Sequence, residues 1–300
     1  MTKAATVEKQ KMEPKILVKR VENLISLPEV CLRINEVMYK PSTTAADLGE
    51  IIALDPGLTT RLLKIVNSAF YNFPSKISTV SHAITIIGTR ELRDLVLATS
   101  AVGAFKNIPN KLVDMEAFWH HSVFCGIVSR VLASEMRQAD GERLFVAGLL
   151  HDIGKLIIYN QLPEESKQIL EYGHGSDEKM LEKEFELLGF NHADVGRELM
   201  IQWGLPERFC EVVGSYYRPL QCHDYLVDAC VVHVANDMAM AIESGTNVEQ
   251  QAAEYTPGFD PKAWRKLELS KDKIEPIMIE SCLKAFEVSE IISPGSTLIY

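Results

Sequence analysis

The chain has 300 residues, of which 47% are hydrophobic and 24% are charged. It can therefore bury a large core without disulfides or structural metals, and it is not a disordered, collagen-like or coiled-coil chain. It has 31 Lys and Arg residues and 41 Asp and Glu residues, so its net charge is −10. Binding to DNA or RNA depends on neutralising phosphates with basic side chains, so this balance argues against a nucleic-acid partner.

The sequence also argues against a membrane or secreted protein. The longest apolar run, residues 95–105, is far shorter than the roughly 20 residues of a membrane helix. The polar residues 1–15 lack the apolar core of a secretory signal. The six cysteines have no regular spacing and mostly sit in apolar runs, which is typical of free buried thiols. We therefore expect a cytoplasmic protein with no membrane partner.

Apolar residues recur at helical spacing along nearly the whole chain. Thr44 and the Asp55-Pro56 pair are typical helix-start signals. Two segments rich in β-branched residues, 77–80 and 226–234, continue into helical spacing, so the fold predicted is all-α. The expected helices cover residues 28–40, 45–54, 56–69, 79–87, 89–105, 116–136, 142–151, 164–172, 177–188, 191–202, 206–216, 224–243, 260–268 and 271–287.

The same pattern suggests how the chain is divided. Residues 106–115 look like a connection between two helical layers, and residues 246–261 are the most linker-like stretch. No repeat of 20 to 50 residues is visible, which argues against a helical solenoid. The expected division is a disordered tail at 1–15, an N-terminal helical subdomain at 16–105, a second helical subdomain at 106–245 and a C-terminal helical extension at 246–300.

The most informative segment is His151-Asp152-Ile153-Gly154-Lys155, which follows an apolar helix. Imidazole and carboxylate together suit Fe, Mn, Ni, Zn or Co. The His-Asp pair alone is weak evidence, but a further histidine, His121, precedes it by 30 residues on a long predicted helix. Gly154 allows a close backbone approach, and Lys155 is a candidate for binding phosphate or another ligand.

This pattern resembles the HD superfamily of metal-dependent phosphohydrolases. The N-terminal half is more specifically similar to the HDOD family, the HD-related output domain, over about residues 19–245. The elements that carry this resemblance are Leu27-Pro28, Asp55-Pro56-Gly57-Leu58, Arg61-Leu62-Leu63, Asn67-Ser68-Ala69-Phe70-Tyr71, Ala83-Ile84 and Ile87-Gly88. The resemblance implies an all-helical fold in which an N-terminal bundle packs on an HD-like helical core. It also implies an output or interaction module of bacterial signalling, often with an eroded metal site.

The resemblance assigns candidate metal ligands residue by residue. His121 matches the first histidine of the superfamily pattern, His151 and Asp152 match the His-Asp pair, and the closing aspartate falls on Asn236. Asp237 and His192 are alternatives. His192 is similar to a further histidine of the HD-GYP phosphodiesterases, but it could equally cap the following helix or satisfy a core carbonyl group.

Departures from the pattern lower the number of metal ions and the hydrolytic activity that we expect. Tyr216 and Tyr217 stand where HD-GYP phosphodiesterases have two further histidines, and Asn236 replaces a charged ligand by a neutral amide. A two-metal centre holds both the attacking and the leaving oxygen of a phosphodiester, so losing ligands of the second site weakens that chemistry. We therefore expect at most one divalent transition metal, from among Fe, Mn, Ni, Zn and Co.

These observations predict a regulatory signal-transduction module that binds a signalling protein in trans or a small ligand such as a nucleotide. We assign no catalytic residue and expect little or no hydrolase activity. The alternatives are a single-metal phosphohydrolase or phosphodiesterase acting on a nucleotide or cyclic dinucleotide, and a purely structural scaffold. His233 is interpreted as a buried, hydrogen-bonded histidine, and Asn67 as a side chain that closes a turn.

Overall fold

The computed structural model describes residues 12–22, 25, 27–38, 44–105, 112–137, 140–174, 176–242 and 248–292. These residues form helices joined by turns and contain no β-strand, so the predicted all-α class is confirmed. Most of the expected tail (1–11), the start of the expected connection (106–111) and residues 293–300 lie outside this description. Within the described ranges, no helix is long and apolar enough to cross a membrane.

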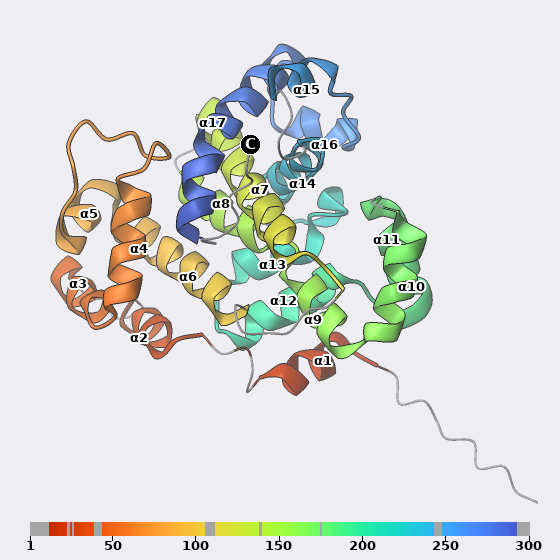
Figure 1. Ribbon diagram of the computed structural model, residues 1–300, viewed down its shortest axis with the longest axis horizontal. Helices are drawn as coiled ribbons and strands as arrows, with labels where there is room; N and C mark the ends of the chain where they lie inside the picture. The colour runs from red at the N-terminus through yellow and green to blue at the C-terminus, as the bar shows by residue number, and fades with distance from the viewer. Residues whose placement is uncertain are drawn as a thin grey trace, which may run out of the picture.

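The N-terminal helices are α1 (Pro14–Val21), α2 (Glu29–Met38), α3 (Ala45–Ala53), α4 (Pro56–Val66), α5 (Val80–Ile87) and α6 (Thr89–Phe105). Helices α2 to α5 lie together at one end of the molecule, and α1 lies apart from them (Figure 1). Thr44, Asp55 and Thr79 accept hydrogen bonds from the first turns of α3, α4 and α5, as N-cap side chains do. Helix α1 was not expected, and it packs on α9 and α12 of the second half rather than on its neighbours in sequence.

The remaining helices build the second half and the C-terminal region. They are α7 (Met115–Glu135), α8 (Gly141–Leu150), α9 (Ile153–Gln161), α10 (Pro163–Gly173), α11 (Asp177–Leu188), α12 (His192–Gln202), α13 (Glu207–Ser215), α14 (Leu226–Met240), α15 (Val248–Glu254), α16 (Pro261–Lys266) and α17 (Ile274–Ile292), with short 3-10 turns at Pro219–Gln221 and Lys271–Lys273. Helix α9 was missed by the sequence analysis, and α15 lies inside the stretch predicted to be a linker.

The buried helix α7 is the axis around which the rest is arranged. It packs against α8, α14 and α17, and α6 packs on α8 to join the N-terminal helices to this core. The hairpin of α10 and α11 projects at the end of the molecule opposite α2–α5 (Figure 1). All six cysteines are free and only Cys282 is partly exposed, which agrees with the expected absence of disulfides.

The Asn67-to-Tyr71 motif joins the N-terminal helices to this core. The Asn67 amide donates to the backbone oxygens of Leu63 and Ile77 at 2.6 and 2.7 Å and accepts from the Ile77 N–H at 2.7 Å. Its interpretation as a turn-closing side chain is therefore confirmed. The turn presents Phe70 to Arg130 of α7, whose guanidinium donates to the Phe70 carbonyl at 2.6 Å and lies 4.0 Å from its ring centre.

Core packing of α4 gives a stability prediction. Leu62 is 1% exposed, whereas Leu63, expected to be equally buried, is only partly buried because it lies to the side of the face formed by Leu58, Leu62 and Ile65. Leu62→Ala should lower the free energy of unfolding by about 2–5 kcal/mol in denaturant melts, and Leu63→Ala by less. Lys179→Ala, on an exposed position, should change it by no more than about 0.5 kcal/mol. Equal effects at all three positions would contradict this assignment of the core.

Candidate metal centre

Four of the predicted ligands come together from three places in the fold. His121 lies on α7, whose start is capped by the Asp114 carboxylate. His151 and Asp152 form the turn between α8 and α9, rather than standing on one helix. Asn236 lies on α14, which packs beside α7 and α8. The Asp152 side chain caps no backbone group of α9 and is therefore available to the site.

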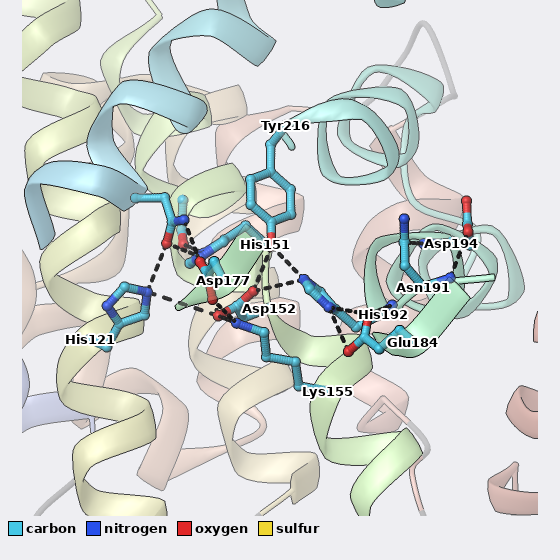
Figure 2. Close-up of polar contacts among 12 residues, drawn as sticks. His121, His151, Asp152, Lys155, Asp177, Glu184, Asn191, His192, Asp194 and Tyr216 are labelled. Atoms are coloured by element: carbon cyan, nitrogen blue, oxygen red, sulfur yellow. Dashed lines mark hydrogen bonds and ion pairs between the residues drawn. The ribbon is translucent and has the colours of Figure 1, made fainter. Parts of the chain in front are cut away.

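The ligand atoms of this group converge on one point (Figure 2). Nε2 of His121 and Nε2 of His151 each lie 3.0 Å from Oδ1 of Asn236. They lie 3.9 and 3.4 Å, respectively, from Oδ2 of Asp152. Ligand atoms about 2.1 Å from one ion are separated by about 3.0–3.4 Å in octahedral or tetrahedral geometry. Three of the four separations fall in this range, and the fourth, 3.9 Å between His121 and Asp152, would have to shorten on binding of a transition metal.

Hydrogen bonds around the group direct lone pairs toward its centre. Nδ1 of His151 lies 2.6 Å from the carbonyl oxygen of Gly148, which can only accept, so a neutral ring has its lone pair on Nε2. The Asn236 amide donates to Asp177 at 2.8 Å, so its oxygen faces the two rings. Flipping the amide would instead place that oxygen against the Asp177 carboxylate. The lone pairs of His151 Nε2 and Asn236 Oδ1 thus face each other as the ligand atoms of a common ion do, and the donor set fits a metal ion.

Protonation states favour the same interpretation. Burial, together with the neighbouring His151, lowers the pKa of His121 to about 4, so this ring is neutral at neutral pH. Burial opposes ionisation of Asp152, but the charges of His151 and Lys155 overcome it and hold the pKa of this carboxyl well below its usual range. Imidazole nitrogens beside an ionised carboxylate are a typical ligand set for a divalent transition metal.

Lys155 connects this group to a carboxylate that was not predicted. Its ammonium group lies 2.7 Å from Asp152 Oδ2 and 3.0 Å from Asp177 Oδ1. Burial disfavours the charged amine, but these two carboxylates raise the pKa of Lys155 well above its usual value. The structure therefore shows Lys155 in an ion-pair network, and its phosphate-binding role stays a prediction.

His192 lies on the side of Asp152 that faces away from His121 (Figure 2). It belongs to a chain of buried polar groups that runs from Asp152 to Glu184. Its Nδ1 lies 2.7 Å from a carboxylate oxygen of Glu184, and its Nε2 lies 2.6 Å from the Tyr216 hydroxyl. That hydroxyl donates to Asp152 Oδ1 at 2.8 Å. Burial opposes protonation of His192, but Glu184 outweighs it and the pKa of His192 is raised. A protonated His192 satisfies every hydrogen bond of this chain.

Local structure explains why His192 reaches Asp152. Asn191 and Asp194 form a capping box that starts α12 at His192. Helices α9 and α12 cross where Gly154 meets Gly196. A Cβ atom on Gly154 would overlap the His192 carbonyl oxygen and lie 2.6 Å from the Gly196 nitrogen. Gly154 thus permits the close approach that the sequence suggested.

Other candidates point away from the centre. Asp237, the alternative to Asn236, accepts hydrogen bonds from the Tyr255 hydroxyl and from the Gly258 N–H, the latter at 3.0 Å. His233 lies with Nδ1 3.0 Å from the Tyr216 carbonyl oxygen and accepts at Nε2 from the Asp260 N–H at 3.0 Å. It is therefore hydrogen-bonded as predicted, but it is only partly buried. The contacts of Asp237 and the contact of His233 with Asp260 tie the segment before α16 to α14.

A cleft of about 590 Å³ adjoins the centre. It lies between α11, the end of α13, α14 and the segment before α16, and both Asp177 and Asn236 reach its wall. Its one arginine, Arg218, lies 5.8 and 5.6 Å from the ring centres of Phe185 and Tyr217. The acidic residues that line it are Asp177, Glu178, Glu182, Asp237 and Asp260.

Sequence reasoning missed two carboxylates in this region, Asp177 and Glu184. Both lie on α11, seven residues apart and therefore about two turns along one helix face. The only available signal was this spacing within a helix rich in charged residues, where most carboxylates are solvated. The structure instead buries Glu184 completely against His192.

The fold and the buried histidine–carboxylate group define an all-helical protein with a candidate metal centre, and the comparisons agree. Residues 24–219 match the HDOD domain, and the chain belongs to this family. It is 24% identical over 237 residues to an uncharacterised protein of Treponema pallidum, matching 77% of this chain and 45% of that protein. The chain thus spans about half the length of this curated relative.

Two solved structures have the same fold. A candidate phosphohydrolase from Shewanella amazonensis superimposes with a TM-score of 0.71 at 22% identity, over 92% of this chain and 98% of that one. A candidate signal transduction protein from Marinobacter aquaeolei superimposes with a TM-score of 0.67 at 19% identity, over 93% of this chain and 64% of that one. The resemblance to the HDOD family is therefore confirmed, together with its all-helical fold.

Proposed function

We propose that the protein is a regulatory module of bacterial signal transduction with one divalent metal at His121, His151, Asp152 and Asn236 and little or no hydrolase activity. Membership of the HDOD family and the likeness to the Marinobacter signal transduction protein support the regulatory role. The convergence of these four side chains supports the metal. Bound there, an ion would link α7, the α8–α9 turn and α14, and it would lower the pKa of a coordinated water.

The observation that carries this proposal is the place of the Tyr216 hydroxyl. It bridges Asp152 Oδ1 and His192 Nε2 at 2.8 and 2.6 Å, where a second ion held by these two side chains would have to lie. Burial and the Asp152 charge raise the pKa of Tyr216 well above its usual value, so the phenol stays protonated and is a poor ligand. A one-metal site without the second Lewis acid follows.

Charge in the adjoining cleft supports the same conclusion. Five carboxylates line it, against Arg218 and His233. A cyclic dinucleotide carries two phosphodiester charges, and like charges across a partly desolvated cleft repel. The proposed ion and Lys155 would attract phosphate at one edge of the cleft, but the carboxylates disfavour a doubly charged dinucleotide along the rest of its wall. We infer that its occupant in a signalling role is a partner protein in trans or a small ligand that is not strongly anionic.

The alternative is a single-metal phosphohydrolase acting on a nucleotide or cyclic dinucleotide. The specific observation in its favour is Lys155, a buried cation 2.7 Å from a proposed metal ligand and able to hold a phosphate. The likeness to the Shewanella phosphohydrolase is consistent with it. In this alternative the single ion would have to activate water without a second metal to hold the leaving oxygen.

An activity assay separates the two functions. We expect wild-type protein supplied with Mn, Fe or Ni to hydrolyse cyclic dinucleotides and nucleotides no faster than the His151→Ala, Asp152→Ala double variant. The physical reason is the missing second ion, together with repulsion of multiply charged phosphate compounds by the carboxylates of the cleft wall. Product formation would be followed by chromatography over many enzyme equivalents. Repeated turnover by the wild type alone would establish the hydrolase and refute the regulatory proposal.

A further inference from the structure

Asp177 is the first residue of α11, and its carboxylate lies directly behind Asn236. We propose that Asp177 is a positioning residue, which orients the Asn236 amide and supplies through it the negative charge that position 236 lacks. This inference rests on the proposed metal site. It adds a residue that neither the sequence pattern nor the family match singles out.

Orientation is the first part of the argument. One oxygen of Asp177 accepts from the Asn236 amide at 2.8 Å, and its other oxygen accepts from Lys155 at 3.0 Å. The carboxylate has two oxygens and no proton to donate, so only the NH₂ group of Asn236 can face it. The Asn236 oxygen is then held 3.0 Å from Nε2 of both His121 and His151.

Charge is the second part. An aspartate at position 236 would bring a second carboxylate to about 2.8 Å from Asp177 Oδ2, where like charges repel strongly. An asparagine removes this repulsion and turns the contact into a charge-assisted hydrogen bond, which polarises the amide oxygen toward the ion. The pair thus carries one negative charge, which resides on Asp177 rather than on the ligand Asn236.

A second carboxylate on the same face of α11 also holds a side chain in place. Glu184, two turns further along, accepts from Nδ1 of His192 at 2.7 Å and from its backbone N–H at 2.9 Å. Asp177 and Glu184 therefore each hold one side chain that points at Asp152 or at the ligands beside it. Asp177 thus resembles the outer carboxylates that orient metal-binding groups, whereas Glu184 holds His192, which lies 3.4 Å from the proposed ligand Asp152.

Metal affinity tests the proposal. Competition titrations with Zn²⁺ or Co²⁺ against a chromogenic chelator would compare wild type with Asp177→Ala, Asp177→Asn and Glu178→Gln. We expect Asp177→Ala to weaken binding by about 10- to 100-fold, as loss of an outer-shell partner does. Asp177→Asn, which keeps an acceptor but no charge, should fall between. The neighbouring Glu178→Gln control removes an exposed carboxylate from the same cleft and should bind like wild type.

A charge exchange distinguishes positioning from a general effect on folding. The double variant Asp177→Asn, Asn236→Asp reverses the pair, so that an amide at 177 donates to a carboxylate at 236. We expect it to bind metal within about tenfold of wild type and more tightly than Asp177→Asn alone. Melting of the chelator-treated proteins should show Asn236→Asp alone less stable than this double variant, because its two carboxylates face each other.

Each outcome is decisive. If wild type binds metal and Asp177→Ala binds it within twofold, or if the exchanged pair binds no better than Asp177→Asn, the positioning role is refuted while the metal site stands. If folded wild-type protein binds no metal, the proposed function fails. Weakened binding by Asp177→Ala, recovered in the exchanged pair and unchanged in Glu178→Gln, supports the inference.

Discussion

His151→Ala is expected to strip the protein of its metal. Protein purified without chelator should hold up to about one equivalent of transition metal per chain, and the variant less than about a tenth. His151 contributes a lone pair whose direction is fixed by the bond between its Nδ1 and Gly148. Without it, one imidazole, one carboxylate and one neutral amide remain, which is a weak set for these ions. Elemental analysis after reconstitution with Mn, Fe, Ni or Zn measures the difference.

His120→Ala is the matched control for this experiment. His120 precedes His121 on α7, but its ring packs on Phe124 rather than on the centre. This variant removes an imidazole of the same helix and should retain the metal content of wild type. Equal metal loss in both variants would indicate damage to α7, and equal retention would contradict the assignment of His151 as a ligand.

Gly154→Ala is expected to cost about 3 kcal/mol or more of unfolding free energy. The added methyl group would meet the backbone of α12 at His192 and Gly196, and backbone atoms of a packed helix cannot rotate away as a side chain can. Relief requires α9 and α12 to separate, which also draws His192 away from Asp152. Chemical denaturation would measure the stability change.

A second glycine gives a control with the opposite sign. Gly103 lies on an exposed face of α6, and a Cβ atom there would meet nothing within 4 Å. Gly103→Ala should leave stability unchanged or raise it by up to about 1 kcal/mol, since alanine is the better helix former. Similar losses of unfolding free energy in the two variants would contradict the close crossing of α9 and α12 at Gly154.

Much of the fold and part of the site were predictable, because their signals are local. Helical spacing and the caps at Thr44 and Asp55 predicted most helices of the N-terminal half. The His151-Asp152 pair, with His121 upstream, predicted the group whose ligand atoms lie within 4.8 Å of one another. Adjacent residues and a fixed spacing on helices are visible in a single sequence.

The missed features depend on contacts between distant segments. Asp177 reaches Asn236 across 59 residues, and nothing within α11 distinguishes it from solvated carboxylates such as Glu178. Helix α9 was missed because the predicted helix 142–151 was taken to be followed by a long connection up to residue 164, whereas a new helix starts directly after Asp152. Helix α1 was missed because its apolar face is short and is buried mainly by α9 and α12, which are distant in sequence.

The single-ion site is tested most directly by anomalous diffraction from crystals of unchelated, metal-reconstituted protein across the Mn, Fe, Ni and Zn edges. We expect one anomalous peak, bound by Nε2 of His121 and His151 and by oxygens of Asp152 and Asn236. The Tyr216 hydroxyl should remain between Asp152 and His192. A second peak in that position, or no peak within the four ligands, would contradict the account.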